Sequence, residues 1–356
     1  MKVFTADENI PLLKEVLQQK NKIYEFTTNN LTNEELIENG TEFLIVRSTI
    51  KVNENLLKNT KVKFVATATS GTDHIDTEYL AKNNINFISS AGSNANSVAE
   101  YVVFSILLWI QKRNRDLSQL TLGIVGFGHI GKKVKIYAET LGIKTLVNDP
   151  PLERQNLSNQ KFCELDEILD KCNIITIHTP MILDGINKTL NLFDANKIEK
   201  IAKNALLINT ARGGIVDENA LFARRNELDF VIDVWENEPD FNLELAREAF
   251  LSTPHIAGHS FEGKLKATKL IVEELNKTYQ LGFALSEVNQ ILSQGTTLTK
   301  EEMKNADLTL SALNESRKLS QDSDFLLSLS DEKTRVKEFK KFRNEYPKRN
   351  EILFLK

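Results

Sequence analysis

Three side chains in the second half of the chain are of types that bind anions and move protons. Arg212 stands in Asn-Thr-Ala-Arg-Gly-Gly, Glu238 stands directly before Pro239, and His255 stands in Thr-Pro-His-Ile-Ala-Gly. A guanidinium can hold a carboxylate through two parallel hydrogen bonds. An imidazole can exchange a proton with a hydroxyl group near neutral pH, and a neighbouring carboxylate orients the ring and favours its charged form.

Each of these residues also has an ordinary explanation when it is taken alone. Arg212 could form a surface ion pair, Glu238 could be a loop acid, and His255 could be a buried histidine with satisfied hydrogen bonds. Their order along the chain, after the nucleotide-binding pattern described next, favours a joint catalytic role. With a nicotinamide they are the parts needed for hydride transfer at a carbon that bears a hydroxyl group.

The stretch from Leu122 to Asp149 predicts a dinucleotide-binding strand–turn–helix–strand unit. An apolar strand runs into Gly126, Gly128 and Gly131, a helical run follows, and a second apolar strand ends on Asp149. The first glycine allows the tight turn, the second lets the backbone approach a pyrophosphate, and the third lets helix and strand pack closely. The helix N-terminus adds free N–H groups and a partial positive charge.

The acid at the end of the second strand predicts the cofactor. Asp149 can accept hydrogen bonds from ribose hydroxyls and would repel a 2′-phosphate, and the residues after it are Pro150 and Pro151 rather than an arginine. We therefore expect NAD in preference to NADP.

The composition limits the remaining classes of function. The chain has 356 residues, a formal net charge of −4 and two cysteines, and 41% of its residues are hydrophobic. This argues against a nucleic-acid-binding protein, a disulfide framework and a zinc site, and no metal is expected. The acids close to Met1 argue against a signal peptide, and the longest apolar run is too short to span a bilayer, so we expect no membrane association and a cytoplasmic location.

Strands alternate with helices along most of the chain, which predicts parallel sheets with ligands at the carboxyl ends of the strands. In the first third, predicted strands cover 2–6, 43–46, 62–68 and 85–88. The ends of the second and third of these carry Arg47, Ser48, Thr69 and Gly71, although Ser, Thr and Gly are also ordinary turn residues. In the second part, predicted strands cover 122–125, 144–149, 173–178, 206–209 and 230–234, and a long buried helix covers 94–111. Asp73, His74 and Asp76 could suggest a metal, but a helix start is the simpler interpretation.

These motifs resemble the D-isomer-specific 2-hydroxyacid dehydrogenases. The resemblance extends through 7–11, 46–54, 66–74, 148–151, 178–192 and 257–264, and covers the chain almost from end to end. It implies that Arg212, Glu238 and His255 are catalytic. It also implies contacts with NAD through Gly126, Gly128, Gly131, Asp149, Thr179, Thr210, Ala211, Arg212, Asp233 and Gly258. The substrate contacts that it implies are Ser48, Thr69 and His259, and His259 departs from the tyrosine common in relatives; we add Arg47 for the substrate phosphate.

Within this family the resemblance points to oxidation of 4-phospho-D-erythronate to 2-oxo-3-hydroxy-4-phosphobutanoate, in pyridoxal 5′-phosphate biosynthesis. The alternatives are another D-2-hydroxy acid, such as 3-phosphoglycerate, or an NAD(H)-sensing binding protein of the corepressor type. The partners implied are a phosphorylated hydroxy acid and a second copy of the chain in a homodimer.

The expected fold is α/β, with two Rossmann-like, doubly wound parallel-sheet domains and a cleft between them. The substrate domain would comprise 1–93 and 257–285, with a returning helix at 271–281, and the NAD domain would comprise 94–256. A small C-terminal α+β dimerisation domain would comprise 286–356. Arg343 or Arg349 of this region, reaching the site of a second subunit, is an alternative source of cations for the phosphate.

Overall fold

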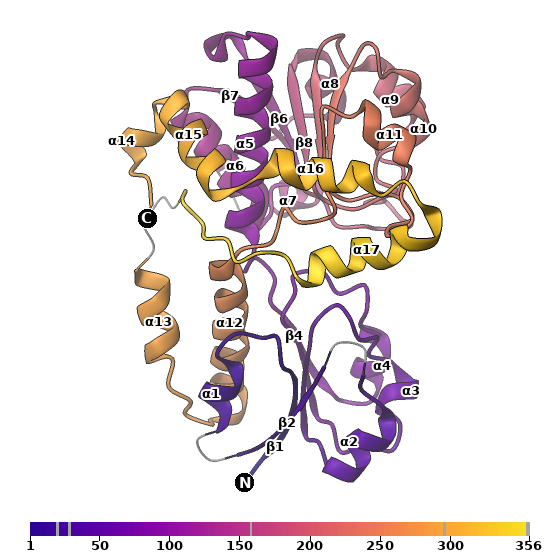
Figure 1. Ribbon diagram of the computed structural model, residues 1–356, viewed down its shortest axis with the longest axis vertical. Helices are drawn as coiled ribbons and strands as arrows, with labels where there is room; N and C mark the ends of the chain where they lie inside the picture. Colours follow the sequence, from indigo (N-terminus) through magenta and orange to yellow (C-terminus); the bar gives the residue numbers. More distant parts are fainter. Residues whose placement is uncertain (19–20, 28–29, 157–158, 295–296, 354–356) are drawn as a thin grey trace. The chain divides into compact units, whose positions relative to one another are not determined.

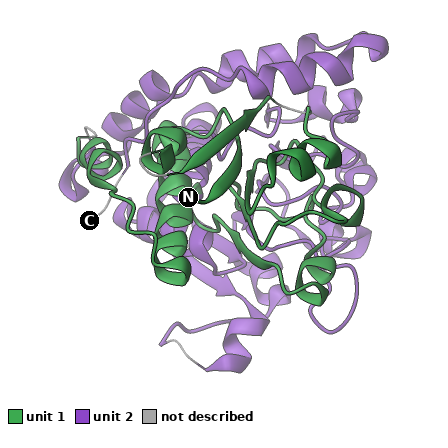
Figure 2. Cartoon of the chain, turned by 90° about the horizontal axis from the view of Figure 1, so that it is seen from below, with its two compact units in different colours: residues 1–94, 260–295 green, residues 95–259, 296–356 purple. Residues whose placement is uncertain are grey.

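The computed structural model describes residues 1–18, 21–27, 30–156, 159–294 and 297–353. Contacts divide the chain into two compact units, unit 1 with Met1–Asn94 and Ser260–Gly295, and unit 2 with Ala95–His259 and Thr296–Lys356 (Figure 2). Each unit contains one parallel β-sheet and its own helices (Figure 1). The prediction of two parallel-sheet α/β domains is confirmed.

The sheet of unit 1 has five parallel strands in the order β2-β1-β3-β4-β5. The strands are β1 (Val3–Asp7), β2 (Lys22–Phe26), β3 (Phe43–Val46), β4 (Phe64–Thr67) and β5 (Asn86–Ser89). The helices are α1 (Leu13–Leu17), α2 (Asn33–Asn39), α3 (Glu54–Leu57), α4 (Thr77–Lys82), α12 (Phe261–Tyr279) and α13 (Ser286–Ser293). The strand order reverses between β1 and β3, which is where ligands bind in sheets of this kind.

Strand β3 explains why an unbroken apolar run is needed in this sheet. Phe43 and Ile45 pack in one hydrophobic cluster with residues of α1 and α12, whereas Leu44 and Val46 pack in a second cluster with residues of α2, α3 and α4. Successive side chains of a strand point to opposite faces, so a strand covered on both faces is apolar throughout.

Helix α12 begins ten residues earlier than the predicted helix over 271–281. Ser260 caps it, because its hydroxyl oxygen accepts a hydrogen bond from the N–H of Gly263 at 3.0 Å. The first turns carry Lys264 and Lys266, and these polar positions weakened the apolar periodicity on which the prediction relied. The predicted helix start at Asp76 is confirmed, since its carboxylate caps α4.

The sheet of unit 2 has six parallel strands in the order β11-β10-β9-β8-β6-β7. The strands are β6 (Thr121–Val125), β7 (Lys144–Asn148), β8 (Ile174–Ile177), β9 (Leu206–Asn209), β10 (Asp229–Ile232) and β11 (Leu251–Ser252). The helices up to residue 259 are α5 (Ala95–Arg113), η2 (Leu117–Gln119, a 3-10 helix), α6 (His129–Thr140), α7 (Pro150–Gln155), α8 (Leu165–Lys171), α9 (Ala195–Lys200), α10 (Glu218–Ala223) and α11 (Leu243–Glu248). Because all six strands are parallel, their carboxyl ends share one edge of the sheet, as predicted.

The C-terminal region adds four helices to unit 2 rather than forming a compact unit of its own. They are α14 (Lys300–Met303), α15 (Ala306–Ser316), α16 (Leu319–Ser328) and α17 (Glu332–Asn344). Leu313 joins the hydrophobic cluster of α5 and α6, and Phe339 joins the cluster on the other side of the sheet. In the described part of this region, the strand content is one isolated bridge between Leu298 and Leu353, which corrects the expected α+β composition. A role in dimerisation stays a prediction.

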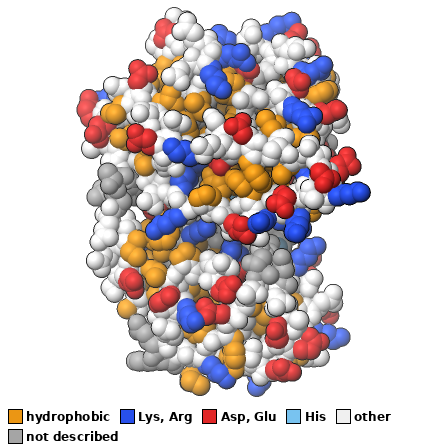
Figure 3. Space-filling view, in the orientation of Figure 1, with side chains coloured by type: hydrophobic (Ala, Val, Ile, Leu, Met, Phe, Trp, Pro, Cys, Tyr) orange, Lys and Arg blue, Asp and Glu red, His pale blue; other side chains and the backbone are white. Residues whose placement is uncertain are grey.

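Helix α5 is buried along most of its length, as its apolar sequence predicts, and it packs on α6 and α15. It begins at Ala95, one residue after the predicted start. Among the described residues, no helix combines the length and the apolar character needed to cross a membrane. On the face shown in Figure 3, basic and acidic side chains are interspersed.

Candidate active site

The glycine turn after β6 has the geometry of a pyrophosphate cradle. Gly126 has φ 95°, and a Cβ there would lie 2.7 Å from the carbonyl carbon of His178, so a side chain is excluded on two grounds. A Cβ at Gly131 would collide with the carbonyl oxygen of Gly126, whereas a Cβ at Gly128 would meet nothing within 4 Å. Gly128 also stands at the N-terminus of α6 and provides no side-chain cap. Open space above exposed N–H groups is what a bound pyrophosphate requires.

Asp149 is held beside this turn by two backbone groups. Its Oδ2 accepts a hydrogen bond from the N–H of Phe127 at 2.7 Å, and its Oδ1 accepts one from the N–H of Leu152 at 3.0 Å. Each carboxylate oxygen can accept a second hydrogen bond, so the side chain can also receive ribose hydroxyls. The carboxylate therefore ties the glycine turn to α7, a structural role that the sequence did not reveal.

The residues after β8 and β9 also fit a bound cofactor. The hydroxyl oxygen of Thr179 is buried and has no hydrogen-bond partner within the described residues, which leaves a polar atom free for a ligand. Thr210 and Ala211 are buried, and the N–H of Ala211 donates to the Asn209 side chain at 3.1 Å. Burial lowers the pKa of the adjacent His178 to about 3, so this imidazole is neutral and adds no charge.

Arg212 lies in the turn that follows β9. Its carbonyl oxygen accepts a hydrogen bond from the side-chain amide of Asn209 at 3.0 Å, and its guanidinium donates to the carbonyl oxygen of Ala211 at 2.8 Å. A Cβ at Gly213 would collide with the carbonyl oxygen of Trp235. The turn that carries Arg212 is therefore packed closely against the segment that leads to Glu238.

Glu238 and His255 form a direct pair. The distance between Glu238 Oε1 and His255 Nδ1 is 2.5 Å, and the two side chains are 22% and 29% exposed. Burial acts to raise the pKa of Glu238, but the charge and hydrogen bond of His255, together with the charge of Arg343, outweigh burial and lower it. The pair thus has a charged carboxylate at Nδ1, and this arrangement directs the other ring nitrogen to a substrate proton.

Asp233 braces the loop that carries His255. Its Oδ1 accepts hydrogen bonds from the N–H of Ile256 and the hydroxyl of Thr253, both at 2.7 Å, and its Oδ2 accepts one from the N–H of Ala257 at 3.0 Å. The side chain is 1% exposed, and burial raises its pKa. Asp233 positions the loop in this structure, and its contact with NAD stays a prediction.

Gly258 and His259 follow on the same loop and are half-buried. The ring of His259 packs edge-to-face against Tyr346, with 5.5 Å between the ring centroids. The carbonyl oxygen of His259 accepts a hydrogen bond from Arg349 at 2.9 Å. Arg349 is only 6% exposed within its own chain, and its reach into the site of a second subunit stays a prediction.

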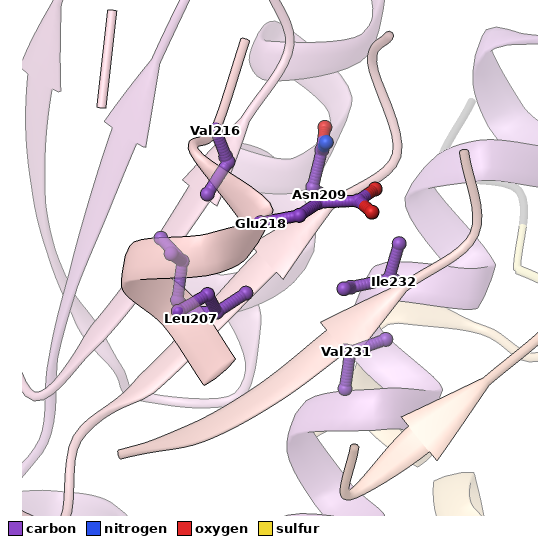
Figure 4. Close-up of a pocket in the computed structure, with 7 residues that line it drawn as sticks. Leu207, Asn209, Val216, Glu218, Val231 and Ile232 are labelled. Carbon is purple, nitrogen blue, oxygen red and sulfur yellow. The ribbon is translucent and has the colours of Figure 1, made fainter. Parts of the chain in front are cut away.

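A small pocket lies between α10 and the strands β9 and β10 (Figure 4). It is lined by Leu207, Asn209, Val216, Glu218, Leu221, Val231 and Ile232. Glu218 accepts a hydrogen bond from the N–H of Glu236 at 2.7 Å, and burial raises its pKa to about 7. Glu218 is therefore a brace for the catalytic loop that sequence reasoning missed.

The predicted substrate residues of unit 1 follow β3 and β4. Arg47 Nη1 lies 3.9 Å from Asp7 Oδ1, Ser48 is exposed, and the Thr69 hydroxyl donates to the carbonyl oxygen of Gly71 at 2.9 Å. Lys264 on α12 is exposed and lies near enough to Arg47 that desolvation, together with the charge of Arg47, lowers its pKa, so it is a second basic side chain beside Arg47. Lys264 stands within 257–264, one of the stretches that carry the family resemblance. The described residues contain no cluster of three or more metal-binding side chains.

Comparisons with known proteins identify the class to which this fold belongs. Residues 108–257 match the family described as D-isomer specific 2-hydroxyacid dehydrogenase, NAD binding domain. NAD⁺-bound 3-phosphoglycerate dehydrogenase of Entamoeba histolytica is 26% identical, with a TM-score of 0.66 over 79% of this chain and 96% of that chain. D-lactate dehydrogenase of Aquifex aeolicus, complexed with NAD and lactic acid, is 26% identical, with a TM-score of 0.63 over 78% and 96%. The fold is that of an NAD-dependent D-2-hydroxyacid dehydrogenase.

Curated relatives narrow this class. An erythronate-4-phosphate dehydrogenase of Bacteroides thetaiotaomicron is 38% identical over 278 residues, which are 77% of this chain and 79% of the relative. Enzymes with the same description from Hydrogenovibrio crunogenus and Escherichia fergusonii are 39% and 40% identical, over 79% and 76% of this chain and 73% and 72% of theirs. The chain belongs to the erythronate-4-phosphate dehydrogenase family.

Proposed function

We propose that the protein oxidises 4-phospho-D-erythronate to 2-oxo-3-hydroxy-4-phosphobutanoate with NAD, as a step of pyridoxal 5′-phosphate biosynthesis. The observation that carries the proposal is the Glu238–His255 pair, 2.5 Å apart, in the unit that also holds the glycine turn. A binding protein of the corepressor type would not need a paired acid and imidazole, so the pair favours turnover over sensing.

In this proposal NAD supplies the hydride acceptor, and the side chains prepare the substrate. His255 accepts the proton of the C2 hydroxyl while Glu238 holds the ring and stabilises its charged form. The guanidinium of Arg212 binds the substrate carboxylate. The cofactor is bound by the glycine turn and by Asp149, Thr179, Thr210, Ala211, Asp233 and Gly258.

The phosphate of the substrate would bind to unit 1. Arg47 and Lys264 supply two positive charges, and Ser48 and Thr69 supply hydroxyl groups at the carboxyl ends of β3 and β4. A dianionic phosphate forms charge-assisted hydrogen bonds with such cations, which an unphosphorylated acid cannot use. His259 is a further proposed substrate contact, carried over from the family resemblance.

Another D-2-hydroxy acid is the main rival substrate. The solved 3-phosphoglycerate dehydrogenase is 26% identical, whereas the curated erythronate-4-phosphate dehydrogenases are 38–40% identical, which favours the four-carbon acid. A homodimer formed through the C-terminal region, and a cytoplasmic location, are parts of the same proposal and follow from the family resemblance.

A substrate panel tests the proposal. Purified enzyme and NAD are offered 4-phospho-D-erythronate, D-erythronate, 3-phospho-D-glycerate and D-lactate, with and without an added 2-oxo acid as a final electron acceptor. We expect the highest kcat/KM with 4-phospho-D-erythronate. A higher value with 3-phospho-D-glycerate, or equal values for the phosphorylated and unphosphorylated erythronates, would replace the proposed substrate.

A further inference from the structure

Three arginines of the C-terminal region bind the loop 255–259 at alternate residues. Arg343 Nε donates to the carbonyl oxygen of His255 at 3.3 Å, and Arg317 Nη2 donates to that of Ala257 at 3.0 Å. Arg349 Nε donates to the carbonyl oxygen of His259 at 2.9 Å. Arg317 directly follows α15, Arg343 lies in the last turn of α17, and Arg349 lies beyond α17. Three separate segments thus converge on one short loop.

The backbone N–H groups of this loop are bound by Asp233 rather than by the arginines. The N–H groups of Ile256 and Ala257 donate to the Asp233 carboxylate, and the N–H of His255 donates to the Asp233 carbonyl oxygen at 2.7 Å. Asp233 therefore holds N–H groups while the arginines hold carbonyl groups. His255 itself has φ 55°, a left-handed conformation that is unfavourable for a residue other than glycine and persists only where the surroundings enforce it.

The charges behind the loop are buried and balanced by an acid on α5. Arg317 and Glu100 are fully buried, and Arg349 is 6% exposed. Glu100 Oε2 lies 3.1 Å from Arg349 Nη1 and 3.9 Å from Arg317 Nε, while its Oε1 accepts hydrogen bonds from the N–H groups of Ile352 and Leu353. Burial and the charge of Arg349 lower the pKa of Arg317 to about 9.

Burying these charged side chains is energetically unfavourable. Removing charges from water costs several kcal/mol for each ion, and a buried ion pair often stabilises a fold no better than apolar residues would. Arg317 also leaves its Nη1 without a hydrogen-bond partner in the described chain. Stability alone is therefore a weak reason for these arginines, whereas fixing the conformation of one loop is a specific one.

We propose that Arg317, Arg343 and Arg349 are positioning residues that hold the loop 255–259 in the conformation that brings His255 to Glu238. The inference rests on the proposed catalytic role of His255. It gives the C-terminal region a part in catalysis within its own subunit, in addition to any role in dimerisation. Arg343 acts in a second way, because its charge helps to keep the Glu238 carboxylate ionised beside the imidazole.

Arg343 is the residue to test, because it is half-buried and its replacement leaves the buried charges intact. Arg343→Met removes the guanidinium and keeps an unbranched chain, and Arg343→Lys keeps the charge but changes the donor. Lys340→Met, at an exposed position on the same helix, is the matched control. The holoenzymes are compared by thermal unfolding, NAD affinity, kcat and KM for 4-phospho-D-erythronate, and the pH dependence of kcat.

We expect Arg343→Met to keep Tm and NAD affinity close to wild type while kcat falls by about tenfold, since small misplacements of a reacting group are expensive. KM should change by less than about threefold, because the proposed substrate contacts remain. Arg343→Lys should restore the wild-type pH profile and only part of kcat. Wild-type kcat in Arg343→Met, or an equal loss in Lys340→Met, would overturn the proposal.

A readout that needs no substrate separates this proposal from the proposed function. The ring resonances of His255, assigned by comparison with His255→Ala, are titrated with pH by NMR in the NAD-bound enzyme. We expect the titration to shift in Arg343→Met and not in Lys340→Met. If wild-type enzyme fails to oxidise 4-phospho-D-erythronate but the titration shifts, the substrate is wrong and the positioning role stands. An unchanged titration would refute that role.

Discussion

Replacing Glu238 with glutamine removes the negative charge beside His255 and leaves a side chain of the same length and hydrogen-bonding reach. Glu238 Oε1 lies 2.5 Å from His255 Nδ1. The charged carboxylate favours the protonated imidazole, so its loss disfavours protonation of the ring. Because the oxidation needs the unprotonated ring as the base, the rising limb of the pH–rate profile should move to lower pH.

The size of this shift follows from the geometry of the pair. Two unit charges ~4 Å apart interact by about 1 kcal/mol in water and about 4 kcal/mol at an effective dielectric constant of ~20. The exposures of 22% and 29% place the pair between these limits. Since ~1.4 kcal/mol corresponds to one pH unit, the limb should move down by about one to three units.

The assay measures kcat from NADH absorbance between pH 5 and 10 for wild type, Glu238→Gln and Glu236→Gln. Glu236 is an exposed carboxylate on the same loop, so its replacement controls for a general change of surface charge. We expect its profile to stay within a few tenths of a pH unit of wild type. A profile that does not move in Glu238→Gln would mean that another group sets the limb and that the pair is only structural.

Four further changes test other parts of the site. Asp149→Ser should narrow the preference for NAD over NADP, measured as the ratio of kcat/KM values, because it removes the charge that repels a 2′-phosphate. His255→Ala should slow hydride transfer by about a hundredfold or more in single-turnover absorbance while NAD still binds. Arg47→Ala should raise KM for 4-phospho-D-erythronate strongly and for D-erythronate much less, because only the first carries the phosphate. In wild type, the raised pKa of Glu218, about 7, lowers the free energy of unfolding by up to about 3 kcal/mol as the pH rises from about 4.5 to 7. Glu218→Gln should remove this loss and so flatten the pH dependence.

Each of these predictions has an outcome that would contradict it. Comparable rates of wild type with NADP and NAD would remove the role of Asp149, and fast hydride transfer in His255→Ala would assign the proton to another group. Equal losses on both erythronates in Arg47→Ala would place that arginine at the carboxylate or in folding. A stability that falls from pH 4.5 to 7 as steeply in Glu218→Gln as in wild type would show that other groups dominate this range.

The sequence predicted the parts of the fold that have a strong local signal. The runs 43–46 and 206–209 match β3 and β9 because both strands are apolar on both faces. Strand β2, Lys22–Phe26, was missed because it lies at the edge of its sheet and carries charged residues. Strand β11 has only two residues, which is too short for any periodicity.

In the candidate site too, residues within local motifs could be predicted, whereas contacts between distant parts of the chain could not. The glycine turn, Asp149 and the sequence around His255 are local motifs, so their positions could be predicted. Arg317 and Arg343 bind loop residues that are 60 and 88 positions away in the chain, and no local pattern reveals such a pairing. Burial also changed the interpretation of Arg349, since its sequence context of charged residues predicts exposure whereas the structure buries it.

The central claim is that hydride leaves C2 of 4-phospho-D-erythronate for NAD under the control of His255. Enzyme in stoichiometric amount is mixed with NAD and with 4-phospho-D-erythronate that carries deuterium at C2, and the nicotinamide cofactor is released and analysed by mass spectrometry. The account predicts one deuterium in the reduced cofactor from wild type, and little or no reduced cofactor from His255→Ala at the same early time. Reduced cofactor without deuterium, or no reduction by wild type, would contradict it.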